Sequence, residues 1–279
     1  MTWLTAFSNL FIVLVMVYFI TCICYLLLHR YFIIFPSRRL SLTPQDYLLE
    51  HEDVYFNTVD KVLLNGWYIK GDQAGEWKDF TIVLFPGNKG TMSDFLVQTK
   101  NLSKAGFNVF LFGYRGFGKS RGILPTEKGV YKDSEAACEY LTGKRHIRMK
   151  NIIFLGQSLG CAMAACTAVK FNPRALILEG GFPSIADVAA RAVKWLPLKL
   201  LTRSRFDTKK FLEKIKCPVL IIHSRDDKAI PLSDADVLFG AVKVKKKKAV
   251  VSGPHVKGLE YDSEAYLMEM IDFLHSTGQ

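Results

Sequence analysis

Near the N-terminus the sequence contains a run of 25 residues, 4–28, without an Asp, Glu, Lys or Arg side chain. Residues 10–28 alone would form a helix about 28 Å long, close to the thickness of the hydrocarbon core of a bilayer. A cleaved signal peptide has a basic first region and small residues before its cleavage site. Residues 1–9 have no Lys or Arg, and the run ends in bulky side chains. The pattern therefore predicts an uncleaved, single-pass transmembrane anchor over residues 1–29, with 4–28 in the lipid bilayer.

The charges that flank this run predict its orientation. Arg30, Arg38 and Arg39 follow it, and no basic residue precedes it. Because lysine and arginine concentrate on the cytoplasmic side of membrane helices, the rest of the chain is predicted to be cytoplasmic. The six cysteines fit a reducing compartment, since two lie in the predicted span and four are scattered without the spacing of metal ligands. No metal or other cofactor is predicted.

Beyond the anchor, the chain has the composition of a folded protein. Over the whole sequence 49% of residues are hydrophobic and 23% are charged, which excludes disorder as the main state. A polar stretch between Pro36 and Pro44 predicts a linker over residues 30–46. Residues 47–279 are enough for one large domain that buries a core without disulfides.

In this domain, strand-like runs alternate with helical stretches. Residues 53–58 and 62–69 alternate polar and apolar side chains, which predicts an antiparallel hairpin. Short runs rich in Val, Ile, Leu and Phe are typical of strands buried on both faces of a parallel sheet. They cover residues 81–85, 108–112, 151–155, 174–178, 218–222 and 248–251. The predicted helices include residues 93–105, 133–141, 159–171 and 263–275. This alternation predicts an α/β fold with a mostly parallel, doubly wound sheet.

Two basic stretches interrupt or follow this pattern. Residues 182–211 are amphipathic and predict a small lid-like insert over the strand ends; its cations alternate with Trp195 and leucines, as in a helix at a membrane surface. Residues 242–248 read VKVKKKK, and two interpretations stay open. The lysines either protect an exposed strand edge from pairing or contact anionic lipid headgroups. No nucleic-acid-binding module is visible, so no nucleic-acid partner is predicted.

Residues 156–160 read Gly-Gln-Ser-Leu-Gly between a predicted strand and an Ala-rich predicted helix. In this context a Gly-x-Ser-x-Gly sequence is typical of a nucleophile elbow, a strained turn that exposes the serine hydroxyl. Ser158 is then the candidate nucleophile, and the backbone N–H of Leu159 faces the negative charge that develops on a substrate. The alternative is an ordinary glycine-rich turn in which the serine caps the helix.

A serine nucleophile needs a base, and the base needs an acid that orients it. In the chain order Ser, Asp, His that goes with such an elbow, the candidates are Asp227 and His255, with Asp226 as the alternative acid. Both follow predicted strands, at the edge of the sheet where Ser158 is expected and where ligands bind in open α/β sheets.

A second backbone donor for an oxyanion is expected in the loop after the predicted strand 81–85. That loop reads Pro-Gly-Asn-Lys-Gly, and the N–H of Asn88 is the best candidate. A glycine-rich loop at this place is also common in α/β proteins that bind no oxyanion.

Together these motifs resemble the α/β-hydrolase superfamily, and within it the single-span, membrane-anchored serine hydrolases related to the yeast bud-emergence protein and to protein depalmitoylases. The resemblance covers about residues 47–273. It rests on Pro86-Gly87-Asn88, Tyr114–Ser120, Gly156–Gly160, Arg205-Phe206-Asp207, His223–Asp227 and Pro254-His255. The family's acid lies four residues after the histidine of the fifth motif, which supports Asp227. Pro86, Ser224 and Pro254 depart from the usual residues, and these departures bear on the substrate more than on the triad.

Residues 113–120 also match G-x-x-x-x-G-K-S, the phosphate-binding loop of nucleotide hydrolases. Such a loop leads directly into a helix whose first amides hold the phosphates. Here Gly122 and Pro125 follow, and the proline disfavours a helix through the residue before it. A glycine-rich loop at the rim of the site is the preferred interpretation.

The resemblance implies a membrane-anchored serine hydrolase that cleaves an acyl ester or thioester, such as a lipid or an acylated protein, through an acyl-enzyme. The catalytic residues would be Ser158, Asp227 and His255, with the amides of Leu159 and Asn88 as the oxyanion hole. Two alternatives stay open: a catalytically inactive binding module with the same fold, and a serine peptidase that uses the same triad.

Overall fold

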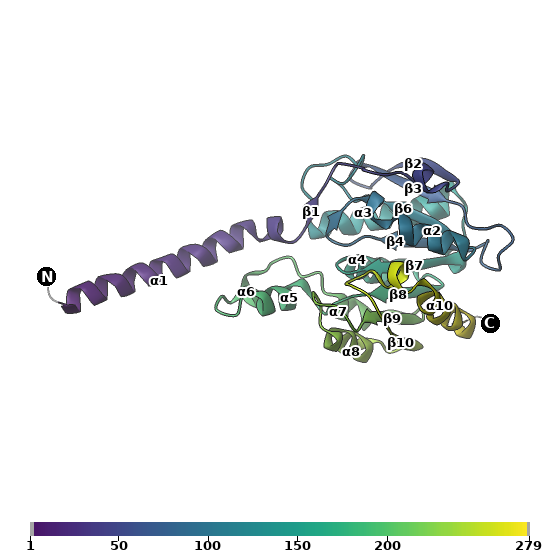
Figure 1. The fold of residues 1–279 in the computed structure, drawn as a ribbon. Helices are drawn as coiled ribbons and strands as arrows, with labels where there is room; N and C mark the ends of the chain where they lie inside the picture. The colour runs from purple at the N-terminus through teal and green to yellow at the C-terminus, as the bar shows by residue number, and fades with distance from the viewer. Residues whose placement is uncertain (1–2, 278–279) are drawn as a thin grey trace.

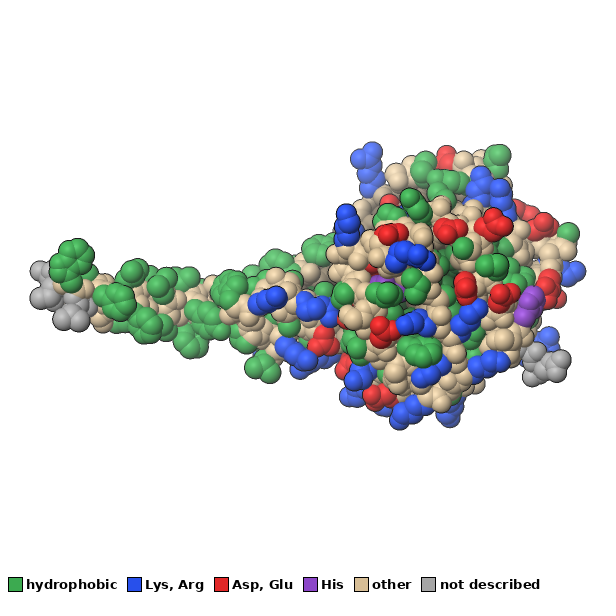
Figure 2. All heavy atoms as spheres, turned by 60° about the horizontal axis from the view of Figure 1, so that its bottom comes forward, with side chains coloured by type: hydrophobic (Ala, Val, Ile, Leu, Met, Phe, Trp, Pro, Cys, Tyr) green, Lys and Arg blue, Asp and Glu red, His purple; other side chains and the backbone are tan. Residues whose placement is uncertain are grey.

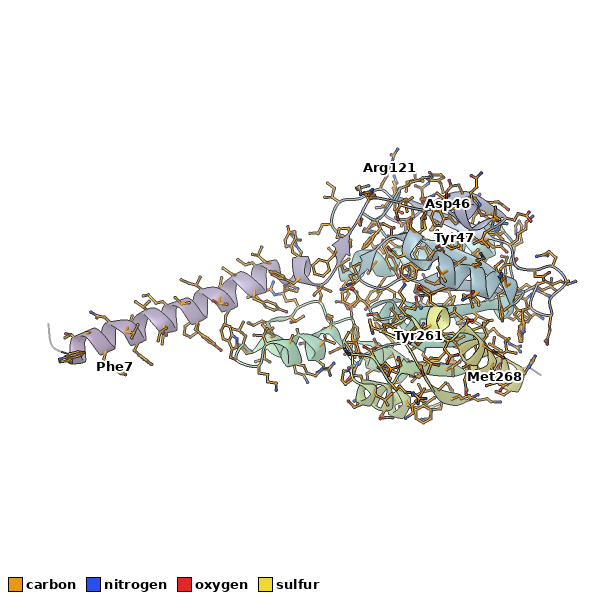
Figure 3. The ribbon with its side chains drawn as sticks, in the orientation of Figure 1. Phe7, Asp46, Tyr47, Arg121, Tyr261 and Met268 are labelled. Atoms are coloured by element: carbon orange, nitrogen blue, oxygen red, sulfur yellow. The ribbon has the colours of Figure 1, made fainter. Side chains whose placement is uncertain are left out.

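A computed structural model describes residues 3–277 and has two parts, a long helix and an α/β body (Figure 1). The helix α1 (Trp3–Leu28) has 26 residues, or about 39 Å at 1.5 Å per residue. It is long and apolar enough to cross a bilayer. Most of its described side chains are exposed, and Phe7, labelled far from the body in Figure 3, is 72% exposed. The apolar helix predicted at the N-terminus is therefore present.

Eight strands form the main sheet, in the order β10-β9-β8-β7-β4-β6-β3-β2. They are β2 (His51–Asn57), β3 (Leu63–Ile69), β4 (Thr81–Phe85), β6 (Asn108–Phe112), β7 (Ile152–Gln157), β8 (Ala175–Glu179), β9 (Val219–Ser224) and β10 (Lys246–Val251). β3 is antiparallel to both β2 and β6, and all other neighbours are parallel. The predicted fold class, a mostly parallel sheet with an N-terminal antiparallel hairpin, is confirmed.

Helices cover both faces of this sheet (Figure 1). One face carries α3 (Glu127–Glu139), α4 (Gly160–Phe171) and α8 (Leu232–Ala241), and the other carries α2 (Leu96–Lys104), the short α9 (Gly258–Tyr261) and α10 (Ser263–Thr277). Every residue of β4, β6, β7 and β8 is buried, because both faces of these strands are covered.

The helices α3 and α8 differ from the sequence-based expectation. α3 begins at Glu127 rather than at residue 133, because the Thr126 side chain accepts a hydrogen bond from the Gly129 amide and caps the helix. α8 was not among the predicted helices. Its first residue follows Pro231, and its apolar side chains Ala235 and Leu238 are buried against the sheet.

The basic run 242–248 lies on and before the edge strand β10, which begins at Lys246. Lys247 pairs with Glu269 at 2.7 Å, and Lys248 pairs with Asp236. The Lys246 ammonium donates to the backbone carbonyls of Phe239 and Val242. These contacts support the first interpretation of the run, in which lysines protect an exposed strand edge.

The insert at 182–211 contains α5 (Ile185–Ala192) and α6 (Leu198–Leu201) and ends in α7 (Thr208–Leu212). It reaches the last turns of α1, beside which it lies in Figure 1. The rings of Tyr18 and Trp195 are 6.3 Å apart, and the Tyr25 hydroxyl is 2.8 Å from the Thr202 hydroxyl. The insert therefore packs against the apolar helix and holds it beside the body.

Part of the predicted linker 30–46 is packed against the body. Ile33 and Ile34 are each only 5% exposed. Next to them, β1 (Phe35–Pro36) pairs in parallel with β5 (Lys89–Gly90), which belongs to the loop after β4. The chain thus makes a short second sheet directly after the apolar helix.

The order of strands fixes where a site can form. β4 lies between β6 and β7, so the connections after β4 and β7 leave toward opposite sides of the sheet. Ligands of open α/β sheets bind in the crevice at the carboxyl ends of such a pair of strands. The loop after β4 contains Asn88, and the turn after β7 contains Ser158.

Candidate active site

Ser158 lies in the turn between β7 and α4, in a backbone conformation that few non-glycine residues adopt. Its φ is +54°, in the left-handed region. The flanking glycines make this turn possible. A Cβ at residue 160 would lie 2.0 Å from the Phe85 carbonyl oxygen, and one at residue 156 would lie 2.7 Å from the Gly160 carbonyl oxygen. The turn is therefore the strained elbow that the sequence predicts.

The structure brings the three predicted side chains together. His255 Nε2 is 2.9 Å from Ser158 Oγ, and His255 Nδ1 is 2.6 Å from Asp227 Oδ2. The three residues come from the loops after β7, β9 and β10. Both distances are within hydrogen-bond range, and they form the chain hydroxyl–imidazole–carboxylate that nucleophilic catalysis by serine requires.

The Asp227 carboxylate is held in one orientation and in its charged form. Only 1% of the side chain is exposed, and Oδ1 accepts hydrogen bonds from the amides of Ala229 (2.8 Å) and Ile230 (2.9 Å). Burial alone would raise the pKa of this carboxyl, but the hydrogen bonds from His255 and from these amides outweigh it and lower the pKa below its usual value. An ionised Asp227 can orient the imidazole and stabilise its cation.

Asp226, the alternative acid, has a different position. Its Oδ2 accepts a hydrogen bond from the Gly253 amide at 3.0 Å. The Ser224 hydroxyl bonds both the Asp226 amide and the Gly253 carbonyl. Asp226 therefore ties the turn after β9 to the loop that carries His255, and Asp227 alone of the two bonds the imidazole.

A pocket of ≈ 530 Å³ lies beside Ser158 and His255. The predicted oxyanion donors Leu159 and Asn88 both line it. Within residues 3–277, neither of their N–H groups donates to a backbone carbonyl. The pocket also has an apolar wall, formed by Phe95, Phe182, Ile185, Val188, Ile230 and Val256. The site thus combines a hydroxyl, a base, two backbone donors and space for an apolar group.

Sequence reasoning missed Glu179, the last residue of β8. Its backbone carbonyl accepts from the Ser158 amide at 2.9 Å. Its buried carboxylate accepts from Gln157 Nε2 at 2.6 Å and from the Gly258 amide at 3.2 Å. Burial raises the pKa of Glu179, and the hydrogen bonds oppose this effect. Glu179 joins the serine turn to the loop after His255. The sequence offered one signal, an acidic residue at the end of an apolar strand. It could not indicate the partners of Glu179, because they lie on other elements.

The phosphate-loop-like sequence 113–120 does not form a phosphate site. No helix follows it directly, since α3 begins at Glu127. The Ser120 hydroxyl donates to the Gly113 carbonyl at 2.7 Å and accepts from the Asn65 amide at 2.9 Å. Lys119 pairs with Asp53 at 3.0 Å. The lysine and serine that would bind phosphate and magnesium are already occupied. In residues 3–277 no group of three or more His, Cys, Asp or Glu side chains is arranged to hold a metal ion.

Comparison with known proteins identifies the family of the chain. Residues 78–212 match the Hydrolase_4 family, described as serine aminopeptidase, S33. The chain is 32% identical to the alpha/beta hydrolase domain-containing protein WAV2 of Arabidopsis thaliana, over 85% of this chain and 83% of that protein. It is 34% identical to protein bem46 of Schizosaccharomyces pombe, over 76% of this chain and 72% of that protein.

Solved structures show the same fold at lower identity. An esterase of Pyrococcus furiosus, Pf2001, superposes with a TM-score of 0.72 at 24% identity and covers 88% of this chain and 100% of that one. An esterase of Exiguobacterium antarcticum has a TM-score of 0.59 at 17% identity, over 80% and 100% of the two chains. The fold, the family match and the relatives together support a hydrolase, and the chain belongs to the α/β-hydrolase superfamily, with bem46 and WAV2 among its relatives.

Proposed function

We propose that the protein is a membrane-anchored serine hydrolase that cleaves acyl esters or thioesters with Ser158, His255 and Asp227. The observation that carries the proposal is the 2.9 Å contact between His255 Nε2 and Ser158 Oγ. This contact allows the imidazole to take the hydroxyl proton as Oγ attacks the substrate carbonyl carbon. Asp227, on the other ring nitrogen, stabilises the imidazolium that forms.

The remaining steps follow from the same groups. The tetrahedral oxyanion faces the amides of Leu159 and Asn88, and such donors contribute about 2.7–4 kcal/mol each in comparable sites. The intermediate collapses to an acyl-enzyme, and His255 gives its proton to the departing alcohol or thiol. Water then attacks the acyl carbon while His255 accepts its proton. The carboxylic acid leaves, and the Ser158 hydroxyl is restored.

The apolar wall of the pocket supports the proposal that the protein recognises the acyl chain of its substrate. Ile185 and Val188 of this wall belong to α5, in the same insert that contacts α1. A lipid or an acylated protein in the bilayer would present its chain from that direction. We therefore favour substrates that are themselves membrane-bound.

The proposed membrane arrangement uses α1 and the insert together. We propose that residues 1–29 form the anchor, with 4–28 in the bilayer, and that 47–279 form the hydrolase domain. α1 is about 9 Å longer than a hydrocarbon core of about 30 Å, so its last turns would lie in the headgroup region of the bilayer, beside the insert. Tyr18 and Trp195 would then lie near the interface, where aromatic rings gather.

Charge supports placing the domain on the cytoplasmic side. Figure 2 shows an apolar helix with lysine and arginine side chains gathered where it meets the body. Arg30 follows the helix, and Lys194 and Arg203 belong to the neighbouring insert. Basic residues favour the cytoplasmic side and the anionic lipids found there.

A serine peptidase is the second candidate, because the matching family description is that of a serine aminopeptidase. The same triad would serve both reactions. The mostly apolar wall beside Ser158 favours an acyl chain over a free amino terminus. Hydrolysis of aminoacyl p-nitroanilides, measured beside p-nitrophenyl acyl esters of graded length, separates the two activities.

The test is labelling of the full-length protein, in detergent micelles, with a fluorophosphonate probe. We expect one labelled site, identified as Ser158 by peptide mass mapping, and no labelling of Ser158→Ala. The wild type should also turn over p-nitrophenyl acyl esters. Labelling of Ser158→Ala equal to that of the wild type would refute the assignment. A folded wild type that neither labels nor turns over would indicate an inactive binding module.

A further inference from the structure

The chain that leaves the apolar helix is hydrogen-bonded to the candidate oxyanion loop. We call residues 33–38 the juxtamembrane segment and residues 86–90 the oxyanion loop. The Phe35 amide donates to the Asn88 carbonyl at 2.8 Å, and Asn88 Nδ2 donates to the Ile33 carbonyl at 2.9 Å. The pairing continues in β1 and β5, where Phe35 is opposite Lys89 and Pro36 is opposite Gly90. Asn88 is therefore bound to this segment through both its backbone and its side chain.

The juxtamembrane segment is itself held on its other side. Ile33 and Ile34 are buried in the hydrophobic core. The Ser37 carbonyl accepts from the Gly118 amide at 2.8 Å, and the Arg38 guanidinium donates to the Ser120 carbonyl at 3.1 Å. The segment lies between the oxyanion loop and the loop 113–120. A fixed segment of this kind can set the position of the loop to which it is bonded.

Apart from these bonds, the oxyanion loop is held at its first residue, where the Tyr114 hydroxyl donates to the Pro86 carbonyl at 3.4 Å. Its regular structure is limited to the two residues of β5, and Gly90 has a φ of +86° that a glycine readily adopts. The loop nevertheless lies against the nucleophile, since a Cβ on Gly87 would be 3.5 Å from Ser158 Cβ. An N–H donor works as part of an oxyanion hole only when it points at the place where the charge develops.

We propose that the juxtamembrane segment is a positioning element of the active site. The Phe35 amide and the Asn88 side chain fix the backbone of residue 88 so that its N–H faces the oxyanion. The stretch that connects the membrane helix to the domain thereby sets the efficiency of the chemical step. This inference rests on the proposed function, because it assigns a role within that reaction. Asn88 suits the task because its amide side chain donates to Ile33 while its backbone N–H stays available.

The test compares kcat, KM and Tm of full-length variants on a p-nitrophenyl acyl ester. Asn88→Ala keeps the backbone N–H and loses the bond to Ile33, and Asn88→Asp places a carboxylate against the Ile33 carbonyl. Phe35→Pro removes the other bond without altering Asn88. We expect kcat to fall about 10-fold or more in each, with KM within about three-fold, because small displacements at a reacting centre mainly slow the chemistry. Tm should change little for the two Asn88 variants, since this side chain is partly exposed.

Asn151→Ala is the matched control, because Asn151 Nδ2 bonds the Asp79 carbonyl at 3.3 Å, away from the pocket. It should keep the wild-type kcat. If Asn88→Ala and Asn88→Asp keep kcat within two-fold of the wild type, the positioning role is refuted, whatever the folding state of Phe35→Pro. Activity that survives in Ser158→Ala would instead refute the proposed function. The two failures are therefore distinguished by different variants.

Discussion

Two glycine-rich loops, each of which follows a buried strand of the main sheet, differ completely in what they do with their polar groups. The turn 156–160 follows β7, and the loop 113–120 follows β6. Each contains a serine. Ser158 Oγ is bonded to the imidazole of His255 beside a pocket. Ser120 is fully buried, and its hydroxyl is bonded to the backbone of Gly113 and Asn65.

The arginine of the second loop is also bound to groups of the protein itself. The Arg115 guanidinium pairs with the buried Asp133 at 2.7 Å and with Asp60 at 3.0 Å. The hydrogen bond from Arg115 lowers the pKa of Asp60. The loop 113–120 therefore stabilises the fold, whereas the turn 156–160 presents a reactive group. A motif predicts binding or catalysis only when the fold leaves its polar atoms accessible to a ligand.

The largest expected effect is on turnover, and it separates the two serines. His255→Ala removes the base bonded to Ser158 and should lower kcat by roughly 10⁴–10⁶-fold. Ser120→Ala should keep kcat within about three-fold but reduce the free energy of unfolding by about 1–3 kcal/mol, since it leaves buried backbone groups without partners. For both variants, ester hydrolysis measures kcat and urea unfolding measures the free energy of unfolding. A loss of kcat in a folded Ser120→Ala as large as that in His255→Ala would overturn the comparison.

A smaller effect is expected when one glycine of each loop is replaced. Gly160→Ala places a methyl 2.0 Å from the Phe85 carbonyl oxygen, so backbone must move. We expect a loss of about 4 kcal/mol or more in the free energy of unfolding. Gly118→Ala places the methyl 3.4 Å from Leu40, and only its φ of +51° is unfavourable, at about 1–2 kcal/mol. Thermal unfolding followed by circular dichroism should rank the two. Equal Tm values would show that the elbow tolerates a side chain.

The smallest expected effect is on the pH dependence of the free energy of unfolding. The pKa of Asp227 is lower in the folded protein than its ordinary value of 3.8. A carboxyl of this kind stabilises the fold above about pH 4, and that contribution is lost as the pH falls through the lowered pKa. Asp227→Asn should therefore be less stable than the wild type at pH 7 by about 1–2 kcal/mol.

Urea unfolding between pH 3 and pH 7 tests this linkage. The difference between the wild type and Asp227→Asn should begin to shrink below about pH 4, because the carboxyl of the unfolded chain is protonated before that of the folded protein. A difference that stays constant across this range contradicts the assigned shift. Asp226→Asn is the control, because its carboxylate bonds a backbone amide rather than His255.

Much of the fold was predictable because its signals are local. The hairpin and the buried parallel strands follow from alternation and from short apolar runs, and the structure confirms the fold class. The start of α3 was not predicted, because its position depends on one capping side chain, Thr126. α8 was missed although its buried side chains face the sheet.

The candidate site was predictable where a motif carried the geometry. Ser158 needs a positive φ and two close backbone approaches, and only glycines at 156 and 160 permit them. Asp227 and His255 were named from chain order and the resemblance, and their distances from each other and from Ser158 fit a triad. Their catalytic role stays a prediction until the variants are measured.

The amino-acid sequence alone determined the apolar helix, the α/β alternation and the identities of the three candidate side chains, because periodicity and short motifs depend on neighbours along the chain. Only the tertiary structure decided that Glu179 links two loops of the site and that residues 33–38 bind the loop of Asn88. In the second case the hydrogen bonds join Phe35 and Ile33 to Asn88, which lies 53 and 55 positions further along the chain. Nearly every residue has the same backbone carbonyl and amide, so the sequence does not indicate which of them will form a given hydrogen bond. Such bonds are identified only in the folded structure.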